Sequence, residues 1–170
     1  QMEKVYGTDS MGMTAENLVE IHKISRDDQD AFAYNSQMKA AKAQASGRLA
    51  EEIVTVEIPQ RKKDPIVFNQ DEFIKANTTQ EILAGLRPAF KNDGSVTAGN
   101  ASGLNDGAAA VLVASEDAVK ANGLTPKARI VASGVVGVEP RIMGIGPVEA
   151  TQKALKRAGL TLDQMDVIEI

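Results

Sequence analysis

The stretch from Ser95 to Ser115, SVTAGNASGLNDGAAAVLVAS, holds the residues best suited to contact a ligand. Small side chains fill it without a break from Thr97 to Gly103. A loop without bulky side chains lets an extended ligand lie against the backbone, where N–H and C=O groups hydrogen bond with it. A tight turn that simply needs small residues has the same pattern, so these residues alone leave both interpretations open.

The residue types that carry covalent catalysis are scarce in this sequence. The 170 residues include no cysteine and a single histidine, His22. A disulfide, a thiolate metal site and a thiol nucleophile are therefore excluded from these residues, and one histidine leaves little for a zinc site or a serine–histidine pair. We expect no catalytic residue and no metal site here.

Composition indicates a soluble globular protein with no nucleic-acid or membrane partner. Hydrophobic residues make up 43% and charged residues 25%, and the net charge is −4. A negative net charge disfavours binding to nucleic acid and to anionic membranes. Because no secretory signal or long apolar segment is present, we expect a cytoplasmic protein.

Capping residues and apolar spacing predict the helices around this loop. Thr14 and Ser25 are typical N-caps, which predicts a short helix over 15–23 and a long helix from 26 to about 46, ended by Gly47. The long helix carries apolar residues at three- and four-residue spacing, which predicts one apolar stripe: Ala31, Tyr34, Met38, Ala41 and Ala45. Shorter helices are predicted after the capping box 78–81, over 116–122 and over 147–158.

The strands are predicted from alternation and from apolar runs. Residues 54–58 alternate and predict a half-buried strand that ends at Pro59, followed by a second strand over 65–68. The apolar runs 108–114 and 167–170 predict strands buried on both faces. A further strand is expected over 128–136.

Five further motifs, in a consistent order, accompany the loop. They are MGMTAEN (Met11–Asn17), SRDDQDAFAYNSQMKA (Ser25–Ala40), LRPAF (Leu86–Phe90), MGIGPVEATQKAL (Met143–Leu155) and LDQMDVIEI (Leu162–Ile170). With the loop they cover nearly the whole chain, and together they resemble the thiolase family. The similarity is greatest to its acetyl-CoA acetyltransferase branch, and a medium-chain 3-ketoacyl-CoA thiolase is the nearest competitor.

The resemblance implies an α/β fold, the thiolase-like five-layer αβαβα arrangement, represented here by the loop domain and parts of both halves. Residues 1–92 correspond to the CoA-binding loop domain, 93–124 to the return into the N-terminal half with its last strand, and 125–170 to the start of the C-terminal half. The chain is expected to be an internal fragment without the family's catalytic cysteines and histidine. Intact members are dimers or tetramers, so a homo-oligomer is expected.

The resemblance also implies contacts with coenzyme A. Ser102 matches a serine whose hydroxyl bonds a pantetheine amide, and Ala98 matches a neighbouring backbone contact. Lys75 stands where related enzymes carry a basic residue beside the adenine and phosphates, although a solvated lysine fits equally. Ser10 replaces a histidine that several members have near the CoA.

Three larger residues, Met11, Phe90 and Met143, match family positions that line a short acyl pocket. Flexible thioethers suit an acetyl or acetoacetyl group because they fill irregular apolar space. A purely structural role in the core fits these three residues almost as well.

The implied activity is acyl transfer. Two acetyl-CoA molecules condense to acetoacetyl-CoA and CoA, or the reverse thiolysis occurs, with coenzyme A as substrate and no separate cofactor. The 170-residue chain is expected to supply the CoA groove and part of the acyl pocket, and to be inactive alone. Two other interpretations stay open: a cysteine-free thiolase-like protein that binds acyl-CoA or lipid without catalysis, and a scaffold module without a ligand.

Overall fold

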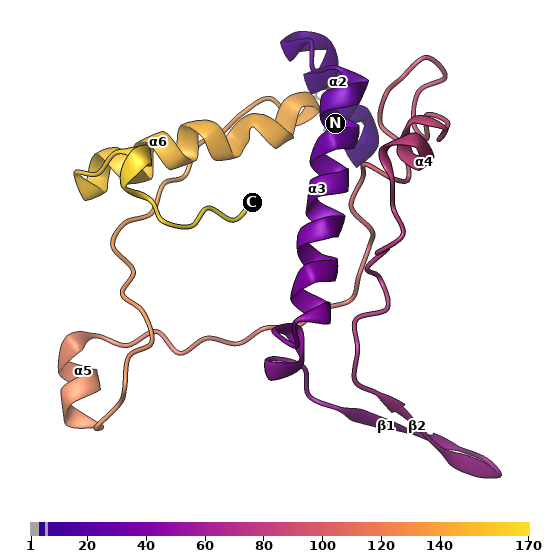
Figure 1. Ribbon diagram of the computed structural model, residues 1–170. Coiled ribbons are helices and arrows are strands. Elements are labelled where there is room, and N and C mark those ends of the chain that lie inside the picture. The colour runs from indigo at the N-terminus through magenta and orange to yellow at the C-terminus, as the bar shows by residue number, and fades with distance from the viewer. Residues whose placement is uncertain (1–3, 6) are drawn as a thin grey trace. The chain divides into compact units, whose positions relative to one another are not determined.

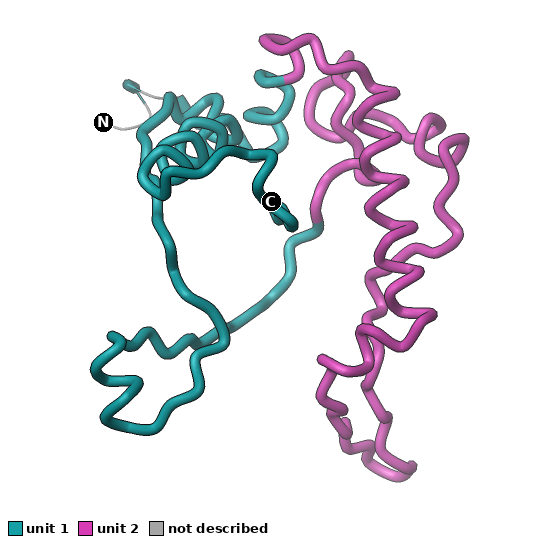
Figure 2. Tube along the Cα trace, turned by 60° about the vertical axis from the view of Figure 1, so that its left-hand side comes forward, with its two compact units in different colours: residues 1–18, 103–170 teal, residues 19–102 magenta. Residues whose placement is uncertain are grey.

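The computed structural model describes residues 4–5 and 7–170, and its contacts divide the chain into two compact units (Figure 2). The central unit comprises residues 19–102. The terminal unit combines the residues up to Leu18 with residues 103–170.

The long helix α3, Arg26–Ala45, is the main element of the central unit (Figure 1). It begins as predicted, because the Ser25 hydroxyl accepts a hydrogen bond from the Asp28 N–H at 3.0 Å. Gly47 follows its C-terminus with a φ of 80°. Most of the predicted apolar stripe is half-buried, and Ala45 is exposed. Within α3, Asp30 alone is buried, because the helix packs mainly against the short elements α4 and η1 (Leu49–Glu51).

A two-stranded antiparallel hairpin extends from the central unit (Figure 1). It consists of β1, Val56–Gln60, and β2, Lys63–Phe68. The prediction of a half-buried strand ending at Pro59 is wrong, since every residue of both strands is exposed and β1 continues to Gln60. Pro59 is tolerated because it lies at an irregularity of the register between Ile58 and Gln60.

Helix α4, Gln80–Ala84, completes the central unit beside α3. Its N-cap is Thr79, whose hydroxyl accepts a hydrogen bond from the Ile82 N–H at 3.2 Å. The predicted cap was one residue earlier, but the Thr78 hydroxyl instead donates to the Lys75 carbonyl at 2.7 Å. The buried apolar residues here are Leu83 of α4 and Val96 of the following loop.

Helix α2, Met11–His22, begins one turn before the predicted range 15–23. The Ser10 hydroxyl accepts from the Met13 N–H at 3.3 Å and takes the capping position assigned to Thr14. Thr14 is buried inside the helix and donates to the Met11 carbonyl at 2.7 Å. Both residues are suitable caps, and the structure uses the earlier one.

The terminal unit contains the helices predicted over 116–122 and 147–158, together with two 3-10 helices. These are α5 (Glu116–Ala121), η2 (Pro140–Ile145), α6 (Gly146–Ala158) and η3 (Leu162–Gln164). Ser115 caps α5 by accepting from the Ala118 N–H at 3.2 Å. Gly159 ends α6 in the left-handed conformation, at a φ of 69°.

The strands predicted over 108–114, 128–136 and 167–170 do not form. Residues 108–114 are exposed throughout, as are 167–170. Residues 131–139 alternate between exposed and half-buried, as an extended chain does, and lie against α6. The Lys153 ammonium bonds the Val135 carbonyl at 2.8 Å, and Arg157 bonds the Ser133 carbonyl at 2.7 Å. A strand needs a neighbour to pair with, and the sheet of the described residues contains just β1 and β2.

Candidate functional site

The small-residue loop is anchored along its first half to the segment that follows α4. Pro88 and Thr97 form an antiparallel bridge, and the Ala89 N–H donates to the Val96 carbonyl at 2.9 Å. The Thr97 side chain is fully buried, and its hydroxyl accepts from the Gly99 N–H at 3.2 Å. One side of the loop is therefore packed against the protein.

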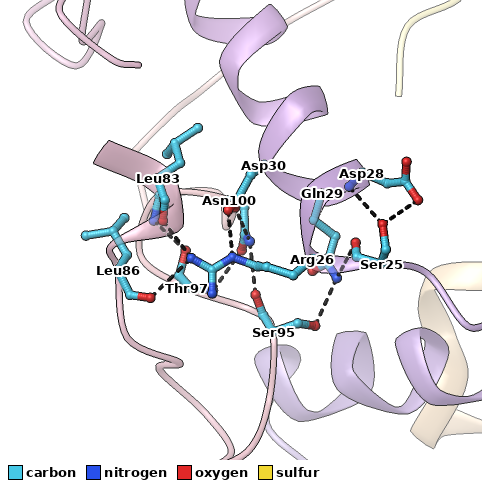
Figure 3. A network of polar contacts seen from close by, with 11 residues as sticks. Ser25, Arg26, Asp28, Gln29, Asp30, Leu83, Leu86, Ser95, Thr97 and Asn100 are labelled. Atoms are coloured by element: carbon cyan, nitrogen blue, oxygen red, sulfur yellow. Dashed lines mark hydrogen bonds and ion pairs between the residues drawn. The ribbon is translucent and has the colours of Figure 1, made fainter. Parts of the chain in front are cut away.

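The Asn100 side chain closes the loop from within (Figure 3). Its Oδ1 accepts from the Thr97 N–H at 2.7 Å, and its Nδ2 donates to the Ser95 carbonyl at 3.0 Å. The same amide nitrogen donates to Asp30 Oδ1 on α3 at 3.0 Å. The loop backbone is thus hydrogen bonded to the long helix through one side chain.

A partly buried ion pair supports this contact (Figure 3). Arg26 Nε lies 2.7 Å from Asp30 Oδ2, and the side chains are 24% and 7% exposed. The other end of the guanidinium donates to the Leu83 carbonyl at 2.6 Å and to the Leu86 carbonyl at 3.1 Å. Arg26 therefore joins α3 to the end of α4 while it neutralises the buried carboxylate.

Three of the sequence-predicted residues of the central unit, Ala98, Ser102 and Phe90, lie on or next to this loop. Ala98 and Ser102 are exposed, and Phe90 directly follows the segment that bridges the loop and is 43% exposed. Lys75 is also exposed, and its N–H donates to Gln37 Oε1 of α3 at 2.8 Å. The structure thus brings Phe90 together with the loop and fixes the backbone of Lys75 against α3.

The two predicted methionines lie in the terminal unit. Met11 is the first residue of α2 and is 70% exposed, and Met143 lies in η2 and is 44% exposed. Buried Asn17 connects these two elements, because its Nδ2 donates to the Arg141 carbonyl at 2.8 Å. Both methionine side chains are therefore exposed.

Sequence reasoning missed the polar residues that hold the loop, namely Arg26, Asp30 and Asn100. One signal was available, because an asparagine within a small-residue loop commonly bonds its own backbone, as Asn100 does. The i,i+4 spacing of Arg26 and Asp30 predicts an ion pair. Nothing in that spacing shows that the pair is buried.

Perturbed carboxyl groups occur at two helix starts rather than at the loop. Hydrogen bonds from its own N–H and from the Thr79 hydroxyl lower the pKa of Glu81. The Thr161 hydroxyl and the residue's own N–H lower the pKa of Asp163. Carboxyls with a lowered pKa stay ionised at neutral pH and make poor general acids. In the part of the chain that the structure describes, no cluster of three metal-binding side chains is found.

Comparison with known proteins identifies the family of this chain. The model of the thiolase N-terminal domain matches residues 1–117, and that of the thiolase C-terminal domain matches residues 124–170. The chain belongs to the thiolase family. A beta-ketoadipyl-CoA thiolase of Acinetobacter baylyi is 57% identical over 170 residues, which is 100% of this chain and 42% of that protein.

Solved structures share the fold. The crystal structure of the Bacillus anthracis acetyl-CoA acetyltransferase has a TM-score of 0.84 and 51% identity, covering 92% of this chain and 40% of that one. Human mitochondrial 3-ketoacyl-CoA thiolase in complex with CoA has a TM-score of 0.82 and 50% identity, covering 92% of this chain and 38% of that one. The predicted thiolase fold is confirmed, and the chain spans about two fifths of the relatives it matches. No helix in the described residues is long and apolar enough to cross a bilayer.

Proposed function

We propose that this chain supplies the coenzyme A-binding surface of a thiolase that condenses two acetyl-CoA molecules to acetoacetyl-CoA and CoA, and catalyses the reverse thiolysis. The observation that carries the proposal is the loop 95–102, which is anchored on one side and presents Ala98 and Ser102 to solvent. The CoA complex of a human thiolase that is 50% identical supports the same ligand class.

Each predicted residue has a role in this proposal. The Ser102 hydroxyl hydrogen bonds a pantetheine amide, and the backbone at Ala98 provides a second polar contact. The exposed Lys75 ammonium offsets the phosphate charge. The exposed side chains of Met11, Phe90 and Met143 contact the acyl group.

The covalent steps need groups outside these residues, which contain no cysteine. In the intact enzyme, a cysteine thiolate attacks an acetyl-CoA carbonyl and the CoA thiolate leaves. A base then removes a proton from the methyl group of a second acetyl-CoA. The resulting carbanion attacks the acyl-enzyme, which releases the cysteine and acetoacetyl-CoA.

We assign residues 1–92 to the loop domain, 93–124 to the return into the N-terminal half, and 125–170 to the start of the C-terminal half. The two family models stop and start between residues 117 and 124, which supports a boundary near 124. We further propose a cytoplasmic homo-oligomer, a dimer or a tetramer, that uses no cofactor besides its CoA substrates.

The first test is turnover by the 170-residue chain itself. Because these residues contain no thiol, the covalent route is absent, and we expect no thiolysis of acetoacetyl-CoA above background. Turnover that rises in proportion to pure protein would contradict the assignment of the chain to CoA binding alone.

The second test is Ser102→Ala in the intact enzyme, with Ser36→Ala on the exposed face of α3 as the matched control. One neutral hydrogen bond contributes about 1 kcal/mol, so the KM for the CoA substrate should rise several-fold while kcat changes little. The control should leave both constants unchanged. A fall in kcat by several orders of magnitude would instead make Ser102 catalytic.

The 57% identity to a beta-ketoadipyl-CoA thiolase favours a second candidate, thiolysis of a longer 3-ketoacyl-CoA. The values of kcat/KM of the intact enzyme for acetoacetyl-CoA, beta-ketoadipyl-CoA and a medium-chain 3-ketoacyl-CoA distinguish the candidates. Preference for acetoacetyl-CoA supports the first proposal.

A further inference from the structure

Asp30 is an unusual residue for the helix that carries it. It lies in the second turn of α3, is 5% exposed, and is the one buried residue of that helix. Burying a carboxylate is costly unless hydrogen bonds and an opposite charge compensate for the lost water. Both its oxygens are bonded, Oδ2 by Arg26 and Oδ1 by Asn100. Both contacts therefore stabilise the buried carboxylate, and the second one also joins α3 to the loop.

The second contact reaches the ligand side of the loop. Asn100 makes three hydrogen bonds: to Asp30, to the Ser95 carbonyl and to the Thr97 N–H. Ala98 lies inside the turn that Asn100 closes, and Ser102 lies two residues after Asn100. Gln29, the neighbour of Asp30, adds a bond from its side chain to the Ser95 hydroxyl at 2.9 Å. Side chains of α3 therefore help to fix the loop, in addition to its bridge with Pro88.

We propose that Asp30 and Asn100 are positioning residues for coenzyme A. The carboxylate holds the Asn100 amide in one orientation, and that amide holds the loop backbone so that Ala98 and Ser102 face the ligand. This proposal rests on the proposed function, because it assumes that the loop binds CoA.

The contacts allow loop positioning to be separated from helix stability. Asn100→Ala removes the three loop bonds but leaves the Arg26–Asp30 ion pair and the bonds from Arg26 to the end of α4. Asn35→Ala is the control, since it removes an exposed asparagine from the same helix as Asp30.

The experiment measures two quantities on the full 170-residue chain: the Kd for free CoA by isothermal titration, and backbone amide exchange by NMR. In Asn100→Ala we expect the Kd to rise about tenfold, since three bonds of roughly fivefold each are lost and only part of their effect passes to the ligand. Exchange of the Thr97 amide should accelerate while the amides of α3 keep their protection. The control should change neither quantity.

A pair of substitutions tests the contact itself. Asn100→Asp places one carboxylate against another, and we expect a larger rise in Kd than with alanine. Adding Asp30→Asn removes the repulsion and supplies a donor on α3 again, so the double variant should recover part of the affinity that Asn100→Asp loses, although the bond to the Ser95 carbonyl stays lost.

The outcomes separate this inference from the proposed function. If the native chain binds CoA and Asn100→Ala binds equally well, or the double variant shows no recovery, the inference is wrong and the proposed function stands. If the native chain does not bind CoA, the proposed function fails and the inference fails with it.

Discussion

Gly99 is the most sensitive position in the loop to added volume. A Cβ at residue 99 would lie 2.5 Å from Leu86 Cδ1 and 2.6 Å from Leu83 Cδ2. Carbon atoms in ordinary contact are about 3.5–4.0 Å apart, so one group must move by roughly an ångström. Leu83 is 3% exposed and has little space into which it can retreat. Gly99→Ala should therefore displace the loop or its support.

The expected magnitude follows from overpacking. An extra methyl group in a packed site costs about 1–3 kcal/mol, and here the cost falls on the contact between the loop and α4. In urea unfolding, the free energy of unfolding of the variant should be lower than that of the native chain by that amount. The Kd for CoA should rise at least about fivefold, because the displaced loop moves Ala98 and Ser102 away from their native positions.

The matched control is Gly85→Ala, at the end of α4. A Cβ there meets the Glu81 and Ile82 carbonyl oxygens at 3.5 and 3.6 Å, which is ordinary contact. We expect its Kd and unfolding free energy to stay within about 0.5 kcal/mol of the native values. If Gly99→Ala also matches the native chain in both quantities, the described packing of the loop is wrong.

Two further predictions concern other parts of the chain. Gly134→Ala should weaken the packing of residues 131–139 on α6 by about 1–3 kcal/mol, since its Cβ would clash with the Ala150 carbonyl oxygen. Gly137→Ala meets nothing within 4 Å and should leave stability unchanged, and urea unfolding distinguishes the two variants. Because the pKa of Glu81 is lowered in the folded chain, its ionised carboxylate stabilises the fold at pH values above the ordinary pKa of glutamate. This contribution is lost as the pH falls through the lowered pKa. The stability difference between native chain and Glu81→Gln should therefore shrink on acidification, and a constant difference would refute the assignment.

The helices were predictable because their signals are local. Ser25, Ser115 and Gly159 each act within one turn of the residue they cap, so the sequence nearby contains the necessary information. The error at α2 has the same origin, since Ser10 and Thr14 both suit the cap and a neighbour-based rule cannot rank them.

The strands were not predictable in the same way. The apolar run 108–114 has the composition of a buried strand, but a strand forms only where another segment pairs with it. The described residues place no strand beside it. By contrast, 56–60 and 63–68 are joined by a short turn and pair with each other, so the hairpin was found even though its burial was not.

The site was predictable in part. Small residues and family motifs located the loop, and the exposed positions of Ala98 and Ser102 are compatible with the roles proposed for them. The support beneath the loop was missed, because Asp30 and Asn100 are 70 positions apart and neither residue type indicates its partner.

The central claim is that coenzyme A binds along the loop 95–102. Backbone amide NMR of the 170-residue chain during titration with CoA tests this claim directly. We predict saturable shifts centred on Ala98–Ser102 and extending to Lys75, with no change in the hairpin 56–68. No saturable shift, or shifts confined to the basic hairpin tip Arg61–Lys63, would contradict it.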